Sequence, residues 1–185
     1  MQIDPDRLAI VNYPDPALRT HAKDVDPADP IVRAVAERMI ALMRQADGIG
    51  LAAPQVGLDW RMFVCDVPAD PVTDGPPTGS GGVCVFLNPT ITDLARDLDV
   101  HDEGCLSLPG ITGDVRRPIE ITFSARDLGG AEINTRAGGM FARCFQHELD
   151  HLDGVLIIDK MPRMARLKNR SAIRALKKEF AEQAP

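Results

Sequence analysis

The spacing of apolar residues first becomes regular between residues 30 and 46. Apolar side chains recur there at helical spacing, at Ile31, Val35, Met39, Leu42 and Met43. Asp29 and Pro30 suit the N-cap and the first turn of a helix, and Gly48 can end it in the left-handed region. The pattern predicts an N-terminal helix over 30–46.

Short segments rich in β-branched and aromatic residues follow this helix. "RMFVCDV" (61–67) and "VCVFLNP" (83–89) each predict a strand, and between them we expect a flexible, exposed insertion loop at 70–82, where turn formers predominate. "IEITFSARDLGGAEINTR" (119–136) predicts two strands that are joined by a turn at Gly129–Gly130.

The C-terminal third of the chain predicts two helices, at about 138–152 and 163–182. The second carries apolar residues on one side, at Leu167, Ile173, Leu176 and Phe180. Short antiparallel strands interleaved with three helices indicate an α+β fold. We expect one catalytic domain over 1–185, with short antiparallel sheets around a central helix and with helices near both ends.

Composition narrows the class of protein. The chain has 185 residues, of which 44% are apolar and 26% charged, a profile typical of a folded globular domain. No stretch approaches the roughly 20 apolar residues of a membrane span, and the formal charge of −6 disfavours binding to DNA. The first residues do not resemble a signal peptide, so a cytoplasmic location and reduced cysteines are expected.

The segment "CFQHELDHLDG" (144–154) carries the most specific chemistry. His147 and His151 are four residues apart, so in a helix both imidazoles lie on one face and can bind one metal ion. Glu148 is offset by about 100°, so it flanks the ion and can reach a water molecule there. A solvated helix with this spacing by chance is the alternative.

Two imidazoles need a third protein ligand to form a catalytic metal site. The residues after His151 include no histidine at a suitable spacing, so the cysteines are the candidates. Cys65 and Cys84 lie within predicted strands, and Cys144 is best explained as packing beneath the site. Cys105 lies in the glycine-containing loop "DEGCLSLPG" and would complete a set of two histidines and one cysteine.

The chain carries three motifs in order, "GIGLAAPQVG" (48–57), "EGCLSLPG" (103–110) and "QHELDHLDG" (146–154). These motifs in this order resemble those of the peptide deformylase family, and the opening "IVNYPDPALRTHAKDVD" (10–26) is also similar. The first motif also resembles a phosphate-binding loop, but it contains neither G-x-G-x-x-G nor G-K-[ST]. The resemblance covers about residues 8–180.

The resemblance implies that Cys105, His147 and His151 bind one divalent metal ion. Fe²⁺ is the expected native ion, and Zn²⁺, Ni²⁺ or Co²⁺ could replace it in a preparation. Glu148 would act as the general acid and base. The side-chain amide of Gln55 and the backbone N–H of Leu106 would stabilise an oxyanion, with the backbone of Gly50 close to the formyl group.

The implied substrate is the N-formylmethionyl end of a nascent polypeptide, which would be hydrolysed to formate and a free N-terminus. The methionine pocket would be lined by Ile49, Met140, Cys144 and Arg143. Arg143 stands where many relatives have an apolar residue. Thr112 stands where a family arginine often meets the substrate backbone, and His101 is a further candidate near the site.

The basic C-terminal helix suggests where in the cell the protein encounters its substrate. Its cations are Arg163, Arg166, Lys168, Arg170, Arg174, Lys177 and Lys178, without an acid among them. The contrast with an acidic chain favours a local electrostatic contact, and the resemblance points to the ribosome near its exit tunnel. A solvated helix is the alternative for this segment.

Other functions have to be weighed against a deformylase. A metallopeptidase would also use H-E-x-x-H, but the cysteine of the second motif argues against it. A catalytically silent relative would have lost a ligand or the general base, which are all present here. A purely structural metal site would be closed by four protein ligands.

Overall fold

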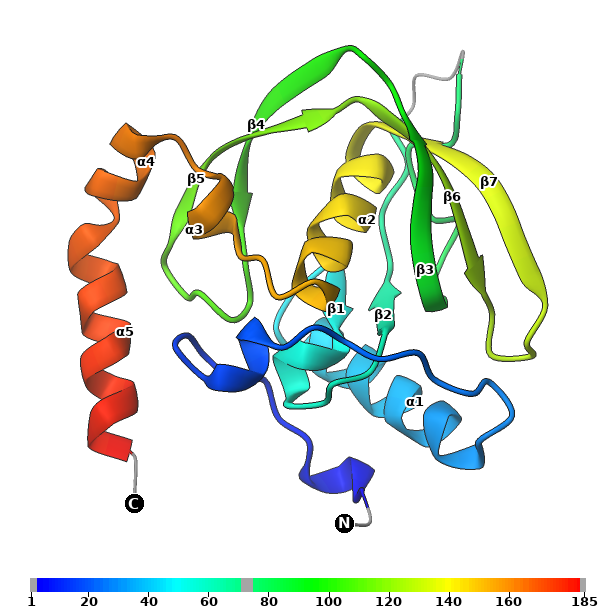
Figure 1. The fold of residues 1–185 in the computed structure, drawn as a ribbon, viewed down its shortest axis with the longest axis horizontal. Helices are drawn as coiled ribbons and strands as arrows, with labels where there is room; N and C mark the ends of the chain where they lie inside the picture. The colour runs from blue at the N-terminus through cyan, green and yellow to red at the C-terminus, as the bar shows by residue number, and fades with distance from the viewer. Residues whose placement is uncertain (1–2, 71–74, 184–185) are drawn as a thin grey trace.

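The computed structural model describes residues 3–70 and 75–183, and its helices and strands are shown in Figure 1. The helices are α1 (Pro30–Gln45), α2 (Gly139–Leu152), α3 (Ile157–Lys160), α4 (Arg163–Lys168) and α5 (Arg170–Gln183). The strands are β1 (Gly50–Ala52), β2 (Met62–Cys65), β3 (Cys84–Leu94), β4 (Leu98–Gly104), β5 (Thr112–Pro118), β6 (Glu120–Arg126) and β7 (Glu132–Gly138). Among the described helices, none is long and apolar enough to cross a membrane.

The strands form two antiparallel sheets. The larger has the order β1-β2-β3-β6-β7, and the smaller is the β4–β5 hairpin. Helix α2 lies between them, with the five-stranded sheet on one side and the hairpin on the other (Figure 1). The predicted α+β fold, with short antiparallel sheets around the H-E-x-x-H helix, is confirmed.

An aromatic cluster holds α2 against the larger sheet. Phe145 of α2 is fully buried, and its ring centroid lies 4.1 Å from that of Phe123 on β6 and 5.0 Å from that of Phe63 on β2. Phe86 on β3 packs edge-on against Phe145 at 5.4 Å. Large buried rings dominate the packing of a small core, so this cluster fixes where the helix lies on the sheet.

Helix α1 begins as its sequence predicts and ends differently. The Asp29 carboxylate accepts a hydrogen bond from the backbone N–H of Ile31, and Pro30 occupies the first turn. The left-handed residue after the helix is Asp47, with φ 53°, and not Gly48 as expected. Gly48 serves close packing instead, because an added Cβ would lie 2.7 Å from Cδ1 of Leu106.

The β4–β5 hairpin was missed by the apolar pattern. Six of the seven residues of β4 are not buried, and the one buried side chain is Glu103. On β5 the buried positions alternate, but they are filled by Gly113, Val115 and Arg117. A pattern search for apolar residues cannot find a hairpin whose buried face carries a carboxylate and a guanidinium.

The remaining strand and helix predictions agree with the structure in position. The 119–136 hairpin turns at Asp127–Gly130, where the N–H of Gly130 donates to the carbonyl of Asp127. The expected C-terminal helix is divided into α4 and α5 at Asn169, whose amide donates to the carbonyl of Thr112.

The insertion loop is only partly described, because residues 71–74 lie outside the described residues. Its second half is attached to the start of α2. The N–H of Gly138 donates to the carbonyl of Pro77, and that of Phe141 donates to the carbonyl of Thr78, both at 2.9 Å. The predicted flexibility of 70–82 remains a prediction.

Candidate metal centre and active site

Two elements bring the three candidate ligands together. His147 and His151 lie one turn apart on α2, with ring centroids 5.0 Å apart, and Cys105 follows the end of β4. One ligand atom from each of the three residues lies within 4.8 Å of the others. The structure therefore brings together the three residues that the sequence proposed as metal ligands.

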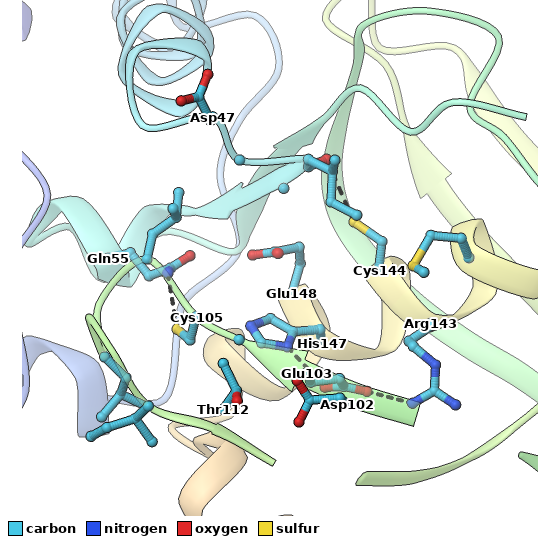
Figure 2. A pocket seen from close by; sticks show the side chains of 18 of the residues that line it. Asp47, Gln55, Asp102, Glu103, Cys105, Thr112, Arg143, Cys144, His147 and Glu148 are labelled. Carbon is cyan, nitrogen blue, oxygen red and sulfur yellow. Dashed lines mark hydrogen bonds and ion pairs between the residues drawn. The ribbon is translucent and has the colours of Figure 1, made fainter. Parts of the chain in front are cut away.

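Hydrogen bonds fix which nitrogen of His147 faces the thiol. Its Nδ1 lies 3.1 Å from Oε2 of Glu103, which leaves Nε2 for the ligand cluster. On His151, Nε2 lies 3.2 Å from Sγ of Cys105. Figure 2 shows the His147 imidazole beside Cys105, with a dashed line that joins it to Glu103. A carboxylate on the outer nitrogen is the usual way in which a metal-binding imidazole is oriented.

Glu103 is itself held by two arginines. Arg117 donates through Nε to Oε1 at 2.7 Å and through Nη2 to Oε2 at 2.9 Å, and Arg143 donates through Nη1 to Oε1 at 2.6 Å. Burial alone would raise the pKa of Glu103, but the hydrogen bonds from His147 and Arg117 outweigh it and hold the pKa well below its usual range. Glu103 is therefore an ionised, buried carboxylate.

Glu148 lies on the other side of the ligand cluster in a different environment. Its side chain is buried, and burial raises its pKa to about 7. Its Oε2 has no hydrogen-bond partner within the described part of the chain. A Cβ at Gly50 would come within 2.3 Å of Oε1 of Glu148, so only glycine lets β1 pass so close to the carboxylate.

Gln55 presents its amide nitrogen to the site. Its Oε1 accepts from the N–H of Ala52 at 2.8 Å, which turns Nε2 toward Sγ of Cys105 at 3.5 Å and toward Oγ of Ser107 at 3.3 Å. Gln55 is buried, so its two hydrogen-bonded ends fix the orientation of the amide. Leu106, the next residue after Cys105, also lines the cavity.

A cavity of about 460 Å³ opens onto the ligand cluster. Its lining includes every residue that the sequence proposed for substrate or oxyanion binding, namely Ile49, Gly50, Gln55, Leu106, Met140, Arg143 and Cys144. Figure 2 shows Gln55 and Cys105 at one end of the cavity and Cys144 and Arg143 at the other, with Glu148 between them. Thr112 also lines this cavity.

Two side chains lie in surroundings that the sequence did not predict. Arg143 lines the cavity as expected, but it is buried and its guanidinium donates to Glu103. His101 does not line the catalytic cavity and is exposed in a neighbouring one. Sequence reasoning missed Glu103 and Arg117 as supports of His147, although Glu103 lies two residues before Cys105 within the second motif.

The donor set fits a divalent metal ion with an open position. One thiol and two imidazoles leave the fourth position of a tetrahedral site open. Glu148 lines the same cavity, and its Oε2 is buried without a hydrogen-bond partner in the part of the chain that the structure describes. A closed structural site would need a fourth protein ligand, and no fourth one joins this group among the described residues. The fold and the site define a metal-dependent hydrolase.

Comparison with known proteins identifies the family. The sequence model of the polypeptide deformylase family matches residues 7–167, and the chain belongs to this family. These enzymes use a metal ion to remove the N-formyl group from nascent peptides.

Relatives support this assignment along most of the chain. Peptide deformylase 2 of Gloeobacter violaceus is 46% identical over 83% of this chain and 79% of its own length. The chloroplastic peptide deformylase 1B of Oryza sativa is 38% identical over 98% of this chain, which spans 65% of that protein.

Solved structures of the family have the same fold. A plant peptide deformylase 1B matches with a TM-score of 0.89 at 38% identity, over 100% of this chain and 96% of that chain. The peptide deformylase of Plasmodium falciparum in complex with an inhibitor matches with a TM-score of 0.80 at 36% identity, over 91% and 99%.

Cys105→Ser tests the third ligand. The neutral hydroxyl of serine is a poor ligand for a soft divalent ion, so we expect metal affinity to fall by at least about 100-fold. Titration with Zn²⁺ against a competing chelator measures the change. Cys84→Ser is the matched control, because Cys84 lies on β3 outside the ligand cluster. Native affinity in Cys105→Ser would rule this cysteine out as a ligand.

Proposed function

We propose that Cys105, His147 and His151 hold one divalent metal ion, and that Glu148 is the acid and base of N-formyl hydrolysis. When bound, the ion would acidify a water molecule and polarise the formyl carbonyl. Glu148 accepts the proton of the attacking water and delivers it to the departing amine. The observation that carries this proposal is the buried Oε2 of Glu148, free of partners among the described residues and adjacent to the ligand cluster.

Oxyanion stabilisation is assigned to Gln55 and Leu106. Nε2 of Gln55 donates toward the reacting carbonyl, and the hydrogen bond from Ala52 keeps this amide from turning its oxygen inward. The backbone N–H of Leu106 supplies the second donor. Gly50 lets the strand approach the formyl group without a side chain between them.

The substrate is the N-formylmethionyl end of a nascent polypeptide. Its methionine side chain enters the part of the cavity lined by the apolar side chains of Ile49, Met140 and Cys144. Arg143 and Thr112 border the same cavity. Deformylation at this site releases formate and leaves a free methionine amino group on the chain.

Fe²⁺ is the proposed native ion. A thiolate cancels one of the two charges of the ion and suits Fe²⁺ as well as Zn²⁺, Ni²⁺ or Co²⁺. We also assign the protein to the cytoplasm as one catalytic domain over residues 1–185. The names of the relatives from rice and Arabidopsis place those proteins in chloroplasts or mitochondria. The cytoplasmic location is therefore proposed for this chain and not for those relatives.

The basic C-terminal segment is proposed to bind the ribosome near its exit tunnel. Arg163, Arg166, Arg170 and Arg174 are exposed on α4 and α5, apart from the half-buried apolar side that faces the body of the protein. In Figure 1 the two helices run along the edge of the molecule, beyond the β4–β5 hairpin. An exposed row of cations can meet phosphates without reshaping the active site.

Glu148→Gln tests the proton carrier. The amide cannot accept and return a proton, so we expect formate release from formyl-Met-Ala to fall by about 10²–10⁴-fold while the metal content stays at the native value. Enzymatic detection of formate, paired with metal analysis of the same sample, makes the measurement. Turnover close to native at full metal occupancy would contradict the role of Glu148.

The identity of the ion is tested by its sensitivity to air. A thiolate beside a redox-active ion is open to oxidation, so the iron form should lose activity in air and keep it under nitrogen. Protein reloaded with Ni²⁺ serves as the control and should keep its activity longer. Equal lifetimes of the two forms in air would argue against a labile native iron.

Ribosome binding is tested by co-sedimentation at low and high salt. Reversal of charge at Arg166, Arg170 and Arg174 to glutamate should abolish pelleting at low salt, because contacts with phosphate release counterions and depend on charge. The native chain should pellet with ribosomes at low salt and dissociate as salt rises. Identical pelleting of both proteins would refute docking through this segment.

A further inference from the structure

A second cavity of about 340 Å³ shares part of its lining with the catalytic cavity. The second cavity is lined by Pro68, Asp70, Asp99, His101, Pro118, Ile119 and Gly139, together with two residues that it shares with the first. Within the described part of the chain these shared residues are Met140 and Arg143. They lie three positions apart on α2, so their side chains are neighbours. Because both residues line both cavities, we call this pair the wall.

One side of this wall is rigid. Arg143 is only 7% exposed, and its guanidinium donates to Oε1 of Glu103 at 2.6 Å, to the carbonyl of Val115 at 3.1 Å and to the carbonyl of Asp99 at 3.2 Å. Moving it would leave a buried carboxylate with fewer donors, which is costly. Met140 is half-buried and has an adaptable, unbranched side chain.

The positive charge of Arg143 is already paired within the protein. Its guanidinium already meets the Glu103 carboxylate, so it does not serve as a binding site for a substrate anion. Figure 2 shows the guanidinium turned toward Glu103, at the end of the cavity where Cys144 also lies. What Arg143 presents to the cavity is therefore a fixed boundary.

We propose that Arg143, with Met140 beside it, sets the depth of the pocket for the first side chain of the substrate. This inference rests on the proposed function, because the apolar end of the cavity has to receive the methionine side chain. An unbranched side chain that is longer than methionine meets the bound guanidinium. It can enter the second cavity only if the wall is removed.

The experiment compares two formyl dipeptides that differ by two methylene groups. They are N-formyl-norleucyl-alanine and N-formyl-2-aminooctanoyl-alanine, and the ratio of their kcat/KM values reports the depth of the pocket. In Arg143→Ala we expect the ratio of the longer to the shorter substrate to rise by about 10-fold or more, since each added methylene gains burial. Metal content is measured in every sample.

Two variants separate the wall from the support of Glu103. Arg143→Met loses the hydrogen bonds to Glu103 but fills most of the same volume, so it should raise the ratio clearly less than Arg143→Ala does. Met140→Ala opens the wall while the bonds of Glu103 stay intact, so it should raise the ratio. A crystal structure of Arg143→Ala should show one continuous cavity in place of two.

An unchanged ratio in both alanine variants would overturn the proposal. Equal shifts in Arg143→Ala and Arg143→Met would also overturn it, because they would mean that Arg143 acts through Glu103 and His147. Calorimetry with the two unformylated dipeptides makes the same comparison without turnover. The longer one should gain affinity over the shorter only when the wall is opened. Absence of formate release by the native, metal-loaded protein would refute the proposed function, and the calorimetric result would still decide the role of the wall.

Discussion

The active site depends on one buried carboxylate, that of Glu103. Its two oxygens accept from Arg117, Arg143 and the Nδ1 side of His147, which brings donors from β5 and α2 to a residue of β4. Removing one partner of such a buried ionic cluster leaves an uncompensated charge, so the cluster is costly to break. Cys105 follows Glu103 by two residues, so the bonds that orient His147 also fix the turn that carries the thiol.

The two faces of α2 are held by different forces, and the site lies where they meet. Toward the large sheet, Phe145 packs among aromatic rings with no polar atom. Toward the β4–β5 hairpin, Arg143 and the His147 imidazole meet Glu103, while Arg117 continues to Asp150 at 2.8 Å. Burial of apolar rings is non-directional, whereas bidentate hydrogen bonds also fix direction. The helix is thus buried by its aromatic face and oriented by its ionic face.

This division explains what the sequence could predict. The three candidate ligands could be proposed from the sequence because helical spacing places His147 and His151 on one face, and because Cys105 lies in a glycine-containing loop. The β4–β5 hairpin was missed because its inward residues include Glu103 and Arg117, which apolar patterns treat as surface. The burial of Arg143 was missed for the same reason, since its partner lies 40 positions earlier in the chain. Local rules predict elements, but contacts distant in sequence decide where a charge is buried.

The site also separates two glutamates by environment. Both are buried, yet Glu103 is surrounded by cationic donors that keep its pKa low, whereas burial dominates at Glu148 and raises its pKa to about 7. A carboxylate that stays ionised is suited to orient an imidazole, and one whose pKa lies near neutrality is suited to exchange a proton. Gly50 contributes to this difference. Because it has no side chain, its strand can pack directly against Glu148, which buries that carboxylate without bringing a side-chain hydrogen-bond donor to it. The same chemical group is therefore suited to two different tasks within one site, and the difference follows from which donors the fold brings to each carboxylate.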